Sequence, residues 1–217
     1  MKVFISADIE GITTTTVWDD CENDLHIKQM TDEVLACING AKKAGATEIV
    51  VIDAHDSGIN IDPTAMPSGV TLYRNWSGHP YSMVAGIDKT FDAAMFIGYH
   101  SPAGRAGNPL SHTMTLDSMY IKLNGVFASE FMLCSYAGVL EGVPAVFLSG
   151  DKTLCEESKM LHPKLITCPV KDGIGRMTMN YSPEDTLQRI EELSEKALRQ
   201  DLSNALPSLA DNFKLEI

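Results

Sequence analysis

Short runs of apolar residues recur along the chain, and longer segments with the period of an α-helix separate them. The runs are rich in β-branched residues, which is typical of buried strands. We expect such strands at residues 3–5, 49–52, 93–97, 145–148 and 165–170. Because strands alternate with helices, the pattern predicts an α/β fold built on a mainly parallel sheet with flanking helices.

Helical periodicity is clearest over residues 31–44, where apolar residues recur on one face and Gly45 ends the pattern. Residues 129–139 and 153–161 are further candidate helices. A Ser-Pro-Glu-Asp sequence at 182–185 is a typical helix start, so we expect a helix from there through residue 199. These helices supply the connections that a parallel sheet requires.

Two shorter features complete the expected elements. Asn124-Gly125 follows an alternating stretch at 119–123 and predicts a hairpin turn. The segment 212–217 is a candidate terminal strand. Both features point to a small amount of β-structure outside the main sheet.

Net charge excludes some partners. The 217 residues include 17 Lys and Arg against 29 Asp and Glu, which gives 17 − 29 = −12. Nucleic acids and anionic membrane surfaces bind clustered Lys and Arg, so we expect neither as the main partner. No run of 18 apolar residues is present to span a membrane.

Cysteine usage bears on the compartment. The chain has five cysteines, an odd number, widely spaced and without a C-x-x-C pair. Reduced thiols explain this pattern better than a disulfide framework does. We therefore expect a cytoplasmic protein.

Polar residues that carry chemistry follow three of the expected strands. Asp8 and Glu10 come after the first strand, His55 after the second and His100 after the third. Ligands of open α/β sheets bind outside the carboxyl ends of the strands, so these side chains should meet at one edge. Carboxylates mixed with imidazoles suit zinc and its neighbours. Their number exceeds the need of one tetrahedral ion and predicts two metals about 3.5–4 Å apart.

Other candidates have plainer interpretations. Asp53 and Asp151 each follow a strand, where an aspartate is more often a turn residue or helix cap. Isolated loop histidines, here His26, His79 and His162, seldom have a function. His112 and Glu130 stay open on this basis, because Glu130 near a helix start is also favoured by the helix dipole.

Six short motifs occur in order between residue 1 and about residue 190. They are Asp8-Ile9-Glu10-Gly11-Ile12, Asp53-Ala54-His55-Asp56, Gly98-Tyr99-His100, Ser111-His112-Thr113-Met114, Asn124-Gly125 through Glu130, and Val143-Pro144 through Gly150-Asp151. In order and spacing the chain resembles the zinc-dependent D-aminopeptidases associated with bacterial dipeptide-transport operons. Each motif alone is weak, but six in order are specific.

This resemblance implies an α/β fold, two zinc ions per chain and release of an N-terminal D-amino acid from short peptides. It also implies a ring-shaped homodecamer whose channel confines the active sites. The residues that match the family's metal ligands are Asp8, Glu10, His55, His100 and Glu130, with Asp8 bridging. His112 matches the histidine that serves as catalytic nucleophile or base, and we favour the base because metal hydroxide is the easier nucleophile. Asp53 is a candidate partner for a ligand histidine.

Two departures from the family bear on specificity. Its members commonly continue several dozen residues further, so we expect one α/β domain over residues 1–217 with a shortened C-terminal segment from about residue 200. After the match at Glu130 the family usually has small residues, whereas this chain has Phe131, Met132 and Cys134. We expect this bulk to narrow or reshape the substrate pocket.

Two other function classes remain open. The same centre could serve another metal-dependent hydrolase, such as an amidase or a phosphoesterase. A phosphoesterase needs basic residues near the site, for which only Arg74 and Arg105 are candidates. The third class is a non-catalytic, metal-stabilised peptide-binding protein, against which an intact His112 argues.

Overall fold

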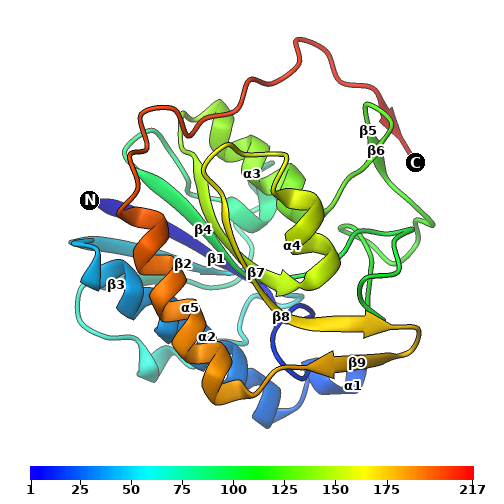
Figure 1. Cartoon of the computed structure of the whole chain (residues 1–217), viewed down its shortest axis with the longest axis horizontal. Coiled ribbons are helices and arrows are strands. Elements are labelled where there is room, and N and C mark those ends of the chain that lie inside the picture. Colours follow the sequence, from blue (N-terminus) through cyan, green and yellow to red (C-terminus); the bar gives the residue numbers. More distant parts are fainter.

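A seven-stranded sheet forms the centre of the computed structural model, which describes residues 1–217 (Figure 1). In spatial order its strands are β3 (Val70–Tyr73), β2 (Glu48–Asp53), β1 (Lys2–Ala7), β4 (Ala93–Tyr99), β7 (Ala145–Asp151), β8 (Ile166–Ile174) and β9 (Met177–Asn180). Neighbouring strands are parallel except at β9, which runs antiparallel to β8. The expected α/β fold with a mainly parallel sheet is confirmed.

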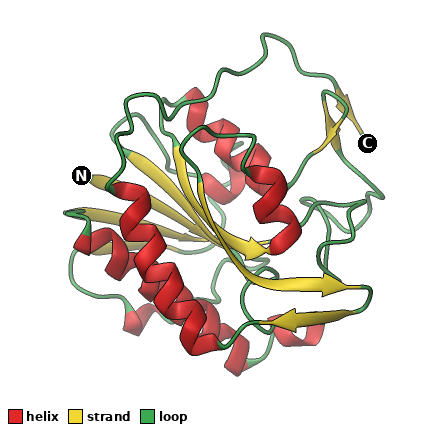
Figure 2. Cartoon of the chain, in the orientation of Figure 1, coloured by secondary structure: helices red, strands yellow, loops and turns green.

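Helices cover both faces of this sheet (Figure 2). They are α1 (Trp18–Cys21), α2 (Asp24–Lys43), α3 (Glu130–Leu140), α4 (Lys152–Ser158) and α5 (Pro183–Leu198), with single 3₁₀ turns at Pro63–Ala65 and Ser82–Val84. Side chains alternate along β1, so Val3 and Ile5 pack with α2 and α5, whereas Phe4 packs in the cluster that contains α3 and α4. No helix combines the length and the apolar composition that crossing a membrane requires.

A small antiparallel sheet lies apart from the main one (Figure 1). It consists of β5 (Lys122–Leu123), β6 (Val126–Phe127) and β10 (Leu215–Glu216), in the order β10-β5-β6. The turn between β5 and β6 is Asn124-Gly125, and both residues have positive φ, 52° and 80°. The predicted hairpin turn and terminal strand are therefore both present, in shorter form.

Several elements differ from the sequence-based expectation, including α1, which no pattern predicted. Helix α2 begins at Asp24 instead of residue 31, because the Asn23 side chain accepts a hydrogen bond from Leu25 N (2.9 Å) and caps it. Of its first seven residues only Met30 is buried, so apolar periodicity does not reveal these turns. Strands β3 and β9 were not expected, since both lie at sheet edges and are only partly buried.

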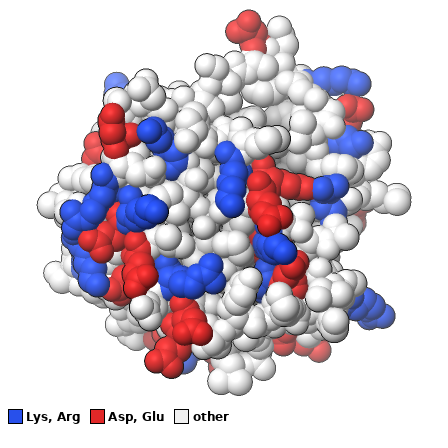
Figure 3. All heavy atoms as spheres, viewed as in Figure 1, with Lys and Arg blue, Asp and Glu red and all other residues white.

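Charged side chains of both signs are mixed on the surface. On the face shown in Figure 3, Lys and Arg are interspersed with Asp and Glu over α2 and α5. Lys43 of α2 pairs with Glu191 of α5, and Arg199 pairs with Glu195 at 2.8 Å. No continuous basic patch is present on this face to attract a nucleic acid.

Strand order places a candidate site at the carboxyl ends of β1, β2 and β4. The chain runs from β1 outward through β2 to β3 and then returns to β4 on the other side of β1. The connections on either side of β1 therefore lead in opposite directions. Such a reversal of strand order leaves a crevice where ligands of α/β proteins bind.

One buried histidine predicts an acid-dependent loss of stability. His162 is 1% exposed beside Phe131 and Tyr136, and neither ring nitrogen has a hydrogen-bond partner. Burial lowers the pKa of His162 to about 4, against about 6.5 in an unfolded chain. The unfolded state thus binds a proton between these values that the folded state does not, so stability should fall as pH decreases from 6.5 to 4, by about 3 kcal/mol.

Urea unfolding at a series of pH values measures this effect. His162→Leu should flatten the dependence in that window, and His79→Gln, which removes an exposed imidazole, should leave it in place. An unchanged slope in His162→Leu would contradict the assignment.

Candidate metal centre

The end of β1 delivers two carboxylates to the crevice. Asp8 and Glu10 are each 2% exposed. Beyond the end of β1, the backbone of residues 8–11 continues alongside β4. Asp8 N donates to Ile97 O (2.9 Å), and Gly11 N donates to Gly98 O (2.7 Å). Gly98 has φ 69°, and a Cβ there would lie 2.2 Å from Asp8 O. Glycine at this position therefore permits the close approach that fixes both carboxylates.

His55 and His100 reach the same place from β2 and β4. The Nδ1 atom of His55 lies 3.0 Å from Glu10 Oε2 and 3.4 Å from Asp8 Oδ1. His100 Nδ1 lies 2.9 Å from Ser101 O. A carbonyl oxygen only accepts, so this nitrogen carries the proton and His100 presents the Nε2 lone pair to the crevice. That Nε2 is 3.5 Å from Asp8 Oδ2.

Asp151, the N-cap residue of α4, holds Ser101, whose carbonyl oxygen orients His100. The Asp151 carboxylate accepts hydrogen bonds from Ser101 N (2.6 Å), Ser101 Oγ (2.6 Å) and Leu154 N (2.9 Å). It caps α4 in doing so, as the plainer interpretation of Asp151 expected. The same cap fixes the carbonyl that selects the tautomer of His100.

Glu130 enters from the first turn of α3. Ser129 caps this helix by accepting from Met132 N at 3.1 Å. The Glu130 carboxylate is buried, accepts from Met114 N (2.7 Å) and lies 3.2 Å from His100 Nε2. It is therefore part of the site and not only an acid favoured by the helix dipole.

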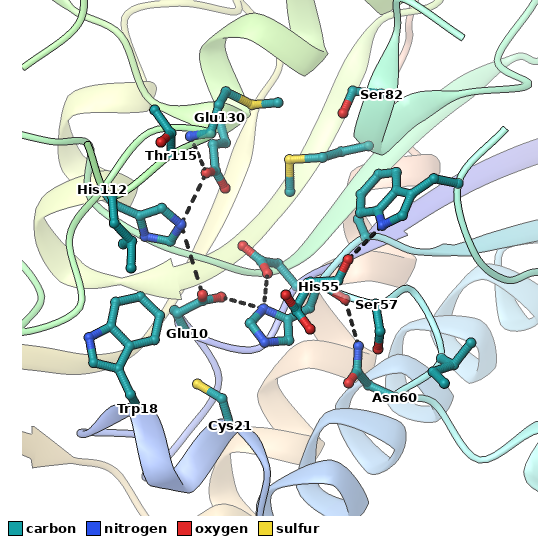
Figure 4. Close-up of a pocket in the computed structure, with 18 of the residues that line it drawn as sticks. Glu10, Trp18, Cys21, His55, Ser57, Asn60, Ser82, His112, Thr115 and Glu130 are labelled. Carbon is teal, nitrogen blue, oxygen red and sulfur yellow. Dashed lines mark hydrogen bonds and ion pairs between the residues drawn. The ribbon is translucent and has the colours of Figure 1, made fainter. Parts of the chain in front are cut away.

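His112 is the last member of the cluster and lies on the long loop between β4 and β5. Figure 4 shows its ring facing Glu130 and Glu10. Its Nδ1 lies 2.9 Å from Leu110 O, which leaves the Nε2 lone pair free. Nε2 is 3.5 Å from Glu130 Oε1 and 4.0 Å from Glu10 Oε1. The ring stacks on His100 with centroids 4.4 Å apart, and Trp18 contacts its edge. The structure thus brings all six predicted site residues together.

Buried charge dominates the electrostatics of this cluster. Burial and the nearby charge of Glu10 raise the pKa of Asp8 well above its usual range. Against the effect of burial, the carboxylates raise the pKa of His55 to about 11 and that of His100 to about 10. Also against burial, these imidazoles hold the pKa of Glu10 below its usual range. The cluster therefore binds positive charge strongly, as protons or as metal ions.

Three groups of three side chains have the spacing of metal ligands, and one of them, Glu10, His100 and His112, shares a residue with each of the other two. Asp8, His100 and Glu130 form the second group, and Glu10, His55 and Cys21 form the third, with the ligand atoms of each within 4.8 Å of one another. Asp8 Oδ2, Glu10 Oε2 and His100 Nε2 are buried without a hydrogen-bond partner. Orphaned atoms of this kind are costly unless a cation satisfies them, so the residues fit two zinc ions.

Sequence reasoning did not identify Lys171, which supports the site from β8. This lysine is fully buried, and its Nζ donates to Glu10 O and Thr15 O. Burial lowers the pKa of Lys171 to about 8. The ammonium therefore fixes the backbone on which Glu10 is carried, although nothing in a strand sequence distinguishes it from an ordinary surface lysine.

Lys171→Met should destabilise the fold by about 1–3 kcal/mol, because two buried carbonyls lose a charged donor. It should also weaken zinc binding by about tenfold, since the orientation of Glu10 depends on it. Urea unfolding and zinc titration measure the two effects. Lys152→Met, which removes an exposed lysine paired with Asp172 at 3.3 Å, is the matched control and should change both by little. Equal effects of the two variants would contradict the role of Lys171.

Two expectations are wrong. Asp53 contacts no imidazole, because its carboxylate accepts from Asn60 N, Asn60 Nδ2 and Ile61 N and so shapes the loop after His55. Phe131, Met132 and Cys134 do not line the cavity. The helix turns them into the apolar core, where Phe131 packs edge-on against Phe96 at 5.0 Å.

The cavity beside the cluster measures about 900 Å³. Trp18, Ile59, Trp76 and Leu116 are among its apolar lining residues. No lysine or arginine lines the cavity. Its five acidic lining residues are Asp8, Glu10, Glu22, Asp56 and Glu130. Arg105 pairs with Glu157, and Arg74 donates to Ile59 O. This charge distribution favours cationic groups on a ligand.

Comparison with known proteins places these features in a family. A family model described as D-aminopeptidase (Peptidase_M55) matches residues 1–217. A D-aminopeptidase of Bacillus subtilis (strain 168) is 32% identical over 181 residues, 81% of this chain and 65% of the relative. The chain thus spans less than two thirds of that relative's length. The solved structure of the Zn-dependent D-aminopeptidase DppA from Bacillus subtilis, described as a self-compartmentalizing protease, matches with a TM-score of 0.85 and 29% identity, over 92% of this chain and 74% of that chain.

Proposed function

Because the chain belongs to the D-aminopeptidase family (Peptidase M55), we propose that it is a zinc aminopeptidase that releases the N-terminal D-amino acid from short peptides. The observation that carries this proposal is the pair of ligand groups around Asp8, Glu10 and His100, each with a buried atom that lacks a hydrogen-bond partner. Asp8 lies between His55 and His100, which suits a bridging ligand of two ions.

The proposed chemistry divides between the ions and His112. Zinc ions bound here would polarise the scissile carbonyl and lower the pKa of a water molecule. His112 Nε2 faces the cavity with a free lone pair, since its Nδ1 is committed to Leu110 O. It accepts the proton of the attacking water at Nε2 and returns it to the departing amine, as a general base and then a general acid. Stacking on His100 and contact with Trp18 hold the ring in place.

The acidic lining supports recognition of a free α-amine. An N-terminal ammonium group is a cation, and the lining acids Glu22 and Asp56 lie outside the ligand set and can accept from it. A phosphoester would bring negative charge into a cavity that lysine and arginine do not line, so the phosphoesterase alternative is disfavoured. An amidase acting on amino acid amides uses the same groups and remains the second candidate.

The proposal extends to assembly and location. Met114, Leu116, Met119 and Val126 expose 46–89% of their surface on the loop and hairpin near the cavity, which supports contacts between copies in a ring-shaped homodecamer. The solved DppA structure is described as self-compartmentalizing. All five cysteines are free and buried, and a reducing cytoplasm keeps thiols in that state.

Metal analysis combined with hydrolysis of D-Ala-D-Ala and L-Ala-L-Ala tests the proposed function. We expect two zinc ions per chain and cleavage of the D-peptide alone. Two metals without cleavage of either peptide would reject the substrate and direct the search to D-amino acid amides. A protein that cannot be loaded with metal would overturn the ligand set.

A further inference from the structure

Helix α1 turns two side chains into the cavity. Trp18 and Cys21 are three residues apart on this short helix, and both line the cavity (Figure 4). The Asp20 carboxylate accepts from Thr16 N (2.8 Å) and Val17 N (3.1 Å) and so fixes the start of the turn. Cys21 is therefore held at the site by its own local structure.

The surroundings of Cys21 differ from those of a cysteine that only packs in a core. Its sulfur lies with ligand atoms of Glu10 and His55 in a group whose members are all within 4.8 Å. This group shares no residue with the group of Asp8, His100 and Glu130. Ligand atoms on one tetrahedral zinc are about 3.3–3.8 Å apart, so side-chain movements of at most about 1.5 Å would complete the coordination.

A second observation points independently to a cation at this position. Glu10 Oε2 is buried and accepts no hydrogen bond, although His55 Nδ1 lies 3.0 Å from it, and Glu10 is 2% exposed. Cys21 itself is 4% exposed, so bulk water does not satisfy this end of the group. A buried carboxylate oxygen, an imidazole and a thiol directed at one space form a typical zinc ligand set.

We infer that Cys21 Sγ is a direct ligand of the metal ion held by Glu10 and His55. This inference rests on the two-metal centre of the proposed function and adds a residue that the carboxylate and imidazole ligands do not include. On binding, the S–H bond breaks, the proton leaves to solvent and a sulfur lone pair forms the metal–sulfur bond, so no oxidation or reduction takes place. The two metal positions are then chemically unequal. One has sulfur, and the other has only oxygen and nitrogen ligands.

Inequality of the positions predicts a difference in metal selectivity. Thiolate is a soft ligand that favours zinc, cobalt or cadmium over magnesium or manganese. The position with Cys21 should therefore retain zinc in the presence of excess manganese. The position with Asp8, His100 and Glu130 should exchange more readily.

Cobalt substitution of the full-length protein tests the inference without measuring activity. A cobalt–thiolate bond gives a sulfur-to-metal charge-transfer band in the near ultraviolet, whereas oxygen and nitrogen ligands give only weak visible bands. We expect the charge-transfer band in the wild-type protein after loading with two equivalents of Co²⁺. Cys21→Ser and Cys21→Ala should lose it and keep the visible bands of the other position.

A cysteine far from the centre supplies the matched control. Cys168 is buried in β8, so Cys168→Ala removes a thiol of similar burial and should retain the band. In cobalt titrations the Cys21 variants should bind one of the two ions about tenfold or more weakly than the wild type does. Losing a residue that only orients a metal ligand already lowers metal affinity by about that much. Cys168→Ala should bind both ions as the wild type does.

The outcomes separate this inference from the proposed function. Two bound cobalt ions without a charge-transfer band in the wild type would overturn the role of Cys21 and leave the two-metal centre standing. A band that persists in Cys21→Ala would also overturn it. A wild-type protein that binds no cobalt would overturn both. Because the wild-type spectrum alone decides the main question, poor folding of a variant would not prevent the test.

Discussion

Replacing His112 with alanine should lower kcat by about 10²–10⁴-fold, the usual contribution of a general acid or base. Metal content should remain that of the wild type, because neither the group of Asp8, His100 and Glu130 nor that of Glu10, His55 and Cys21 includes His112. His100 also retains its hydrogen bond to Ser101 O. Steady-state kinetics on D-Ala-D-Ala and metal analysis of the same sample measure both quantities. A loss of activity with full metal loading would place His112 in the proton transfer.

A second substitution separates chemistry from packing. His112→Gln keeps a polar side chain beside Trp18. The glutamine amide, however, cannot carry a proton between water and the amine near neutral pH. It should therefore be as inactive as His112→Ala. Full activity in either variant would refute the mechanism, and restored activity in glutamine alone would mean that His112 only orients the substrate.

Zinc added to the metal-free protein should raise its melting temperature steeply. Each site filled at a thousandfold excess over Kd adds about 4 kcal/mol. For a chain of this size that corresponds to roughly 8–16 °C per site. The gain arises because the ions bind the folded chain, in which Asp8, Glu10 and Glu130 are buried close together, and not the unfolded chain. Thermal unfolding over a range of zinc concentrations measures it.

Asp8→Asn gives the discriminating control for this effect. Burial and the charge of Glu10 raise the pKa of Asp8, so the metal-free fold gains nothing from its negative charge. The variant without metal should therefore melt at or above the temperature of the metal-free wild type, yet respond weakly to zinc. His112→Ala should show the full zinc response. An equal response in Asp8→Asn would remove Asp8 from the ligand set.

Residues that follow buried strands were the ones that the sequence located by physical reasoning. Apolar runs marked β1, β2 and β4, and parallel strands bring their carboxyl ends to one edge, so Asp8, Glu10, His55 and His100 were predicted to meet. Those residues account for four of the six predicted site positions. The predicted carboxyl-terminal limits of the strands fell one to four residues short, because polar residues at strand ends carry no apolar signal.

The remaining positions depend on contacts that no local pattern encodes. Glu130 and His112 came from the family resemblance, since a helix start and a loop histidine are ambiguous by themselves. Cys21 lies on a one-turn helix after a threonine run, where neither periodicity nor a strand end marks it. Lys171 looks like an outward-facing strand residue until β8 is placed over the loop after β1.

The central place of β1 in the sheet has a consequence for synthesis of the protein. A growing chain that has emerged only as far as the loop after β2 contains Asp8, Glu10, Cys21 and His55. It does not yet contain β4, which His100 follows, or α3, which begins at Glu130. The complete centre therefore cannot template folding in the way that a metal organises a zinc finger. The position that needs His100 and Glu130 can therefore be filled only after β4 and α3 are in place.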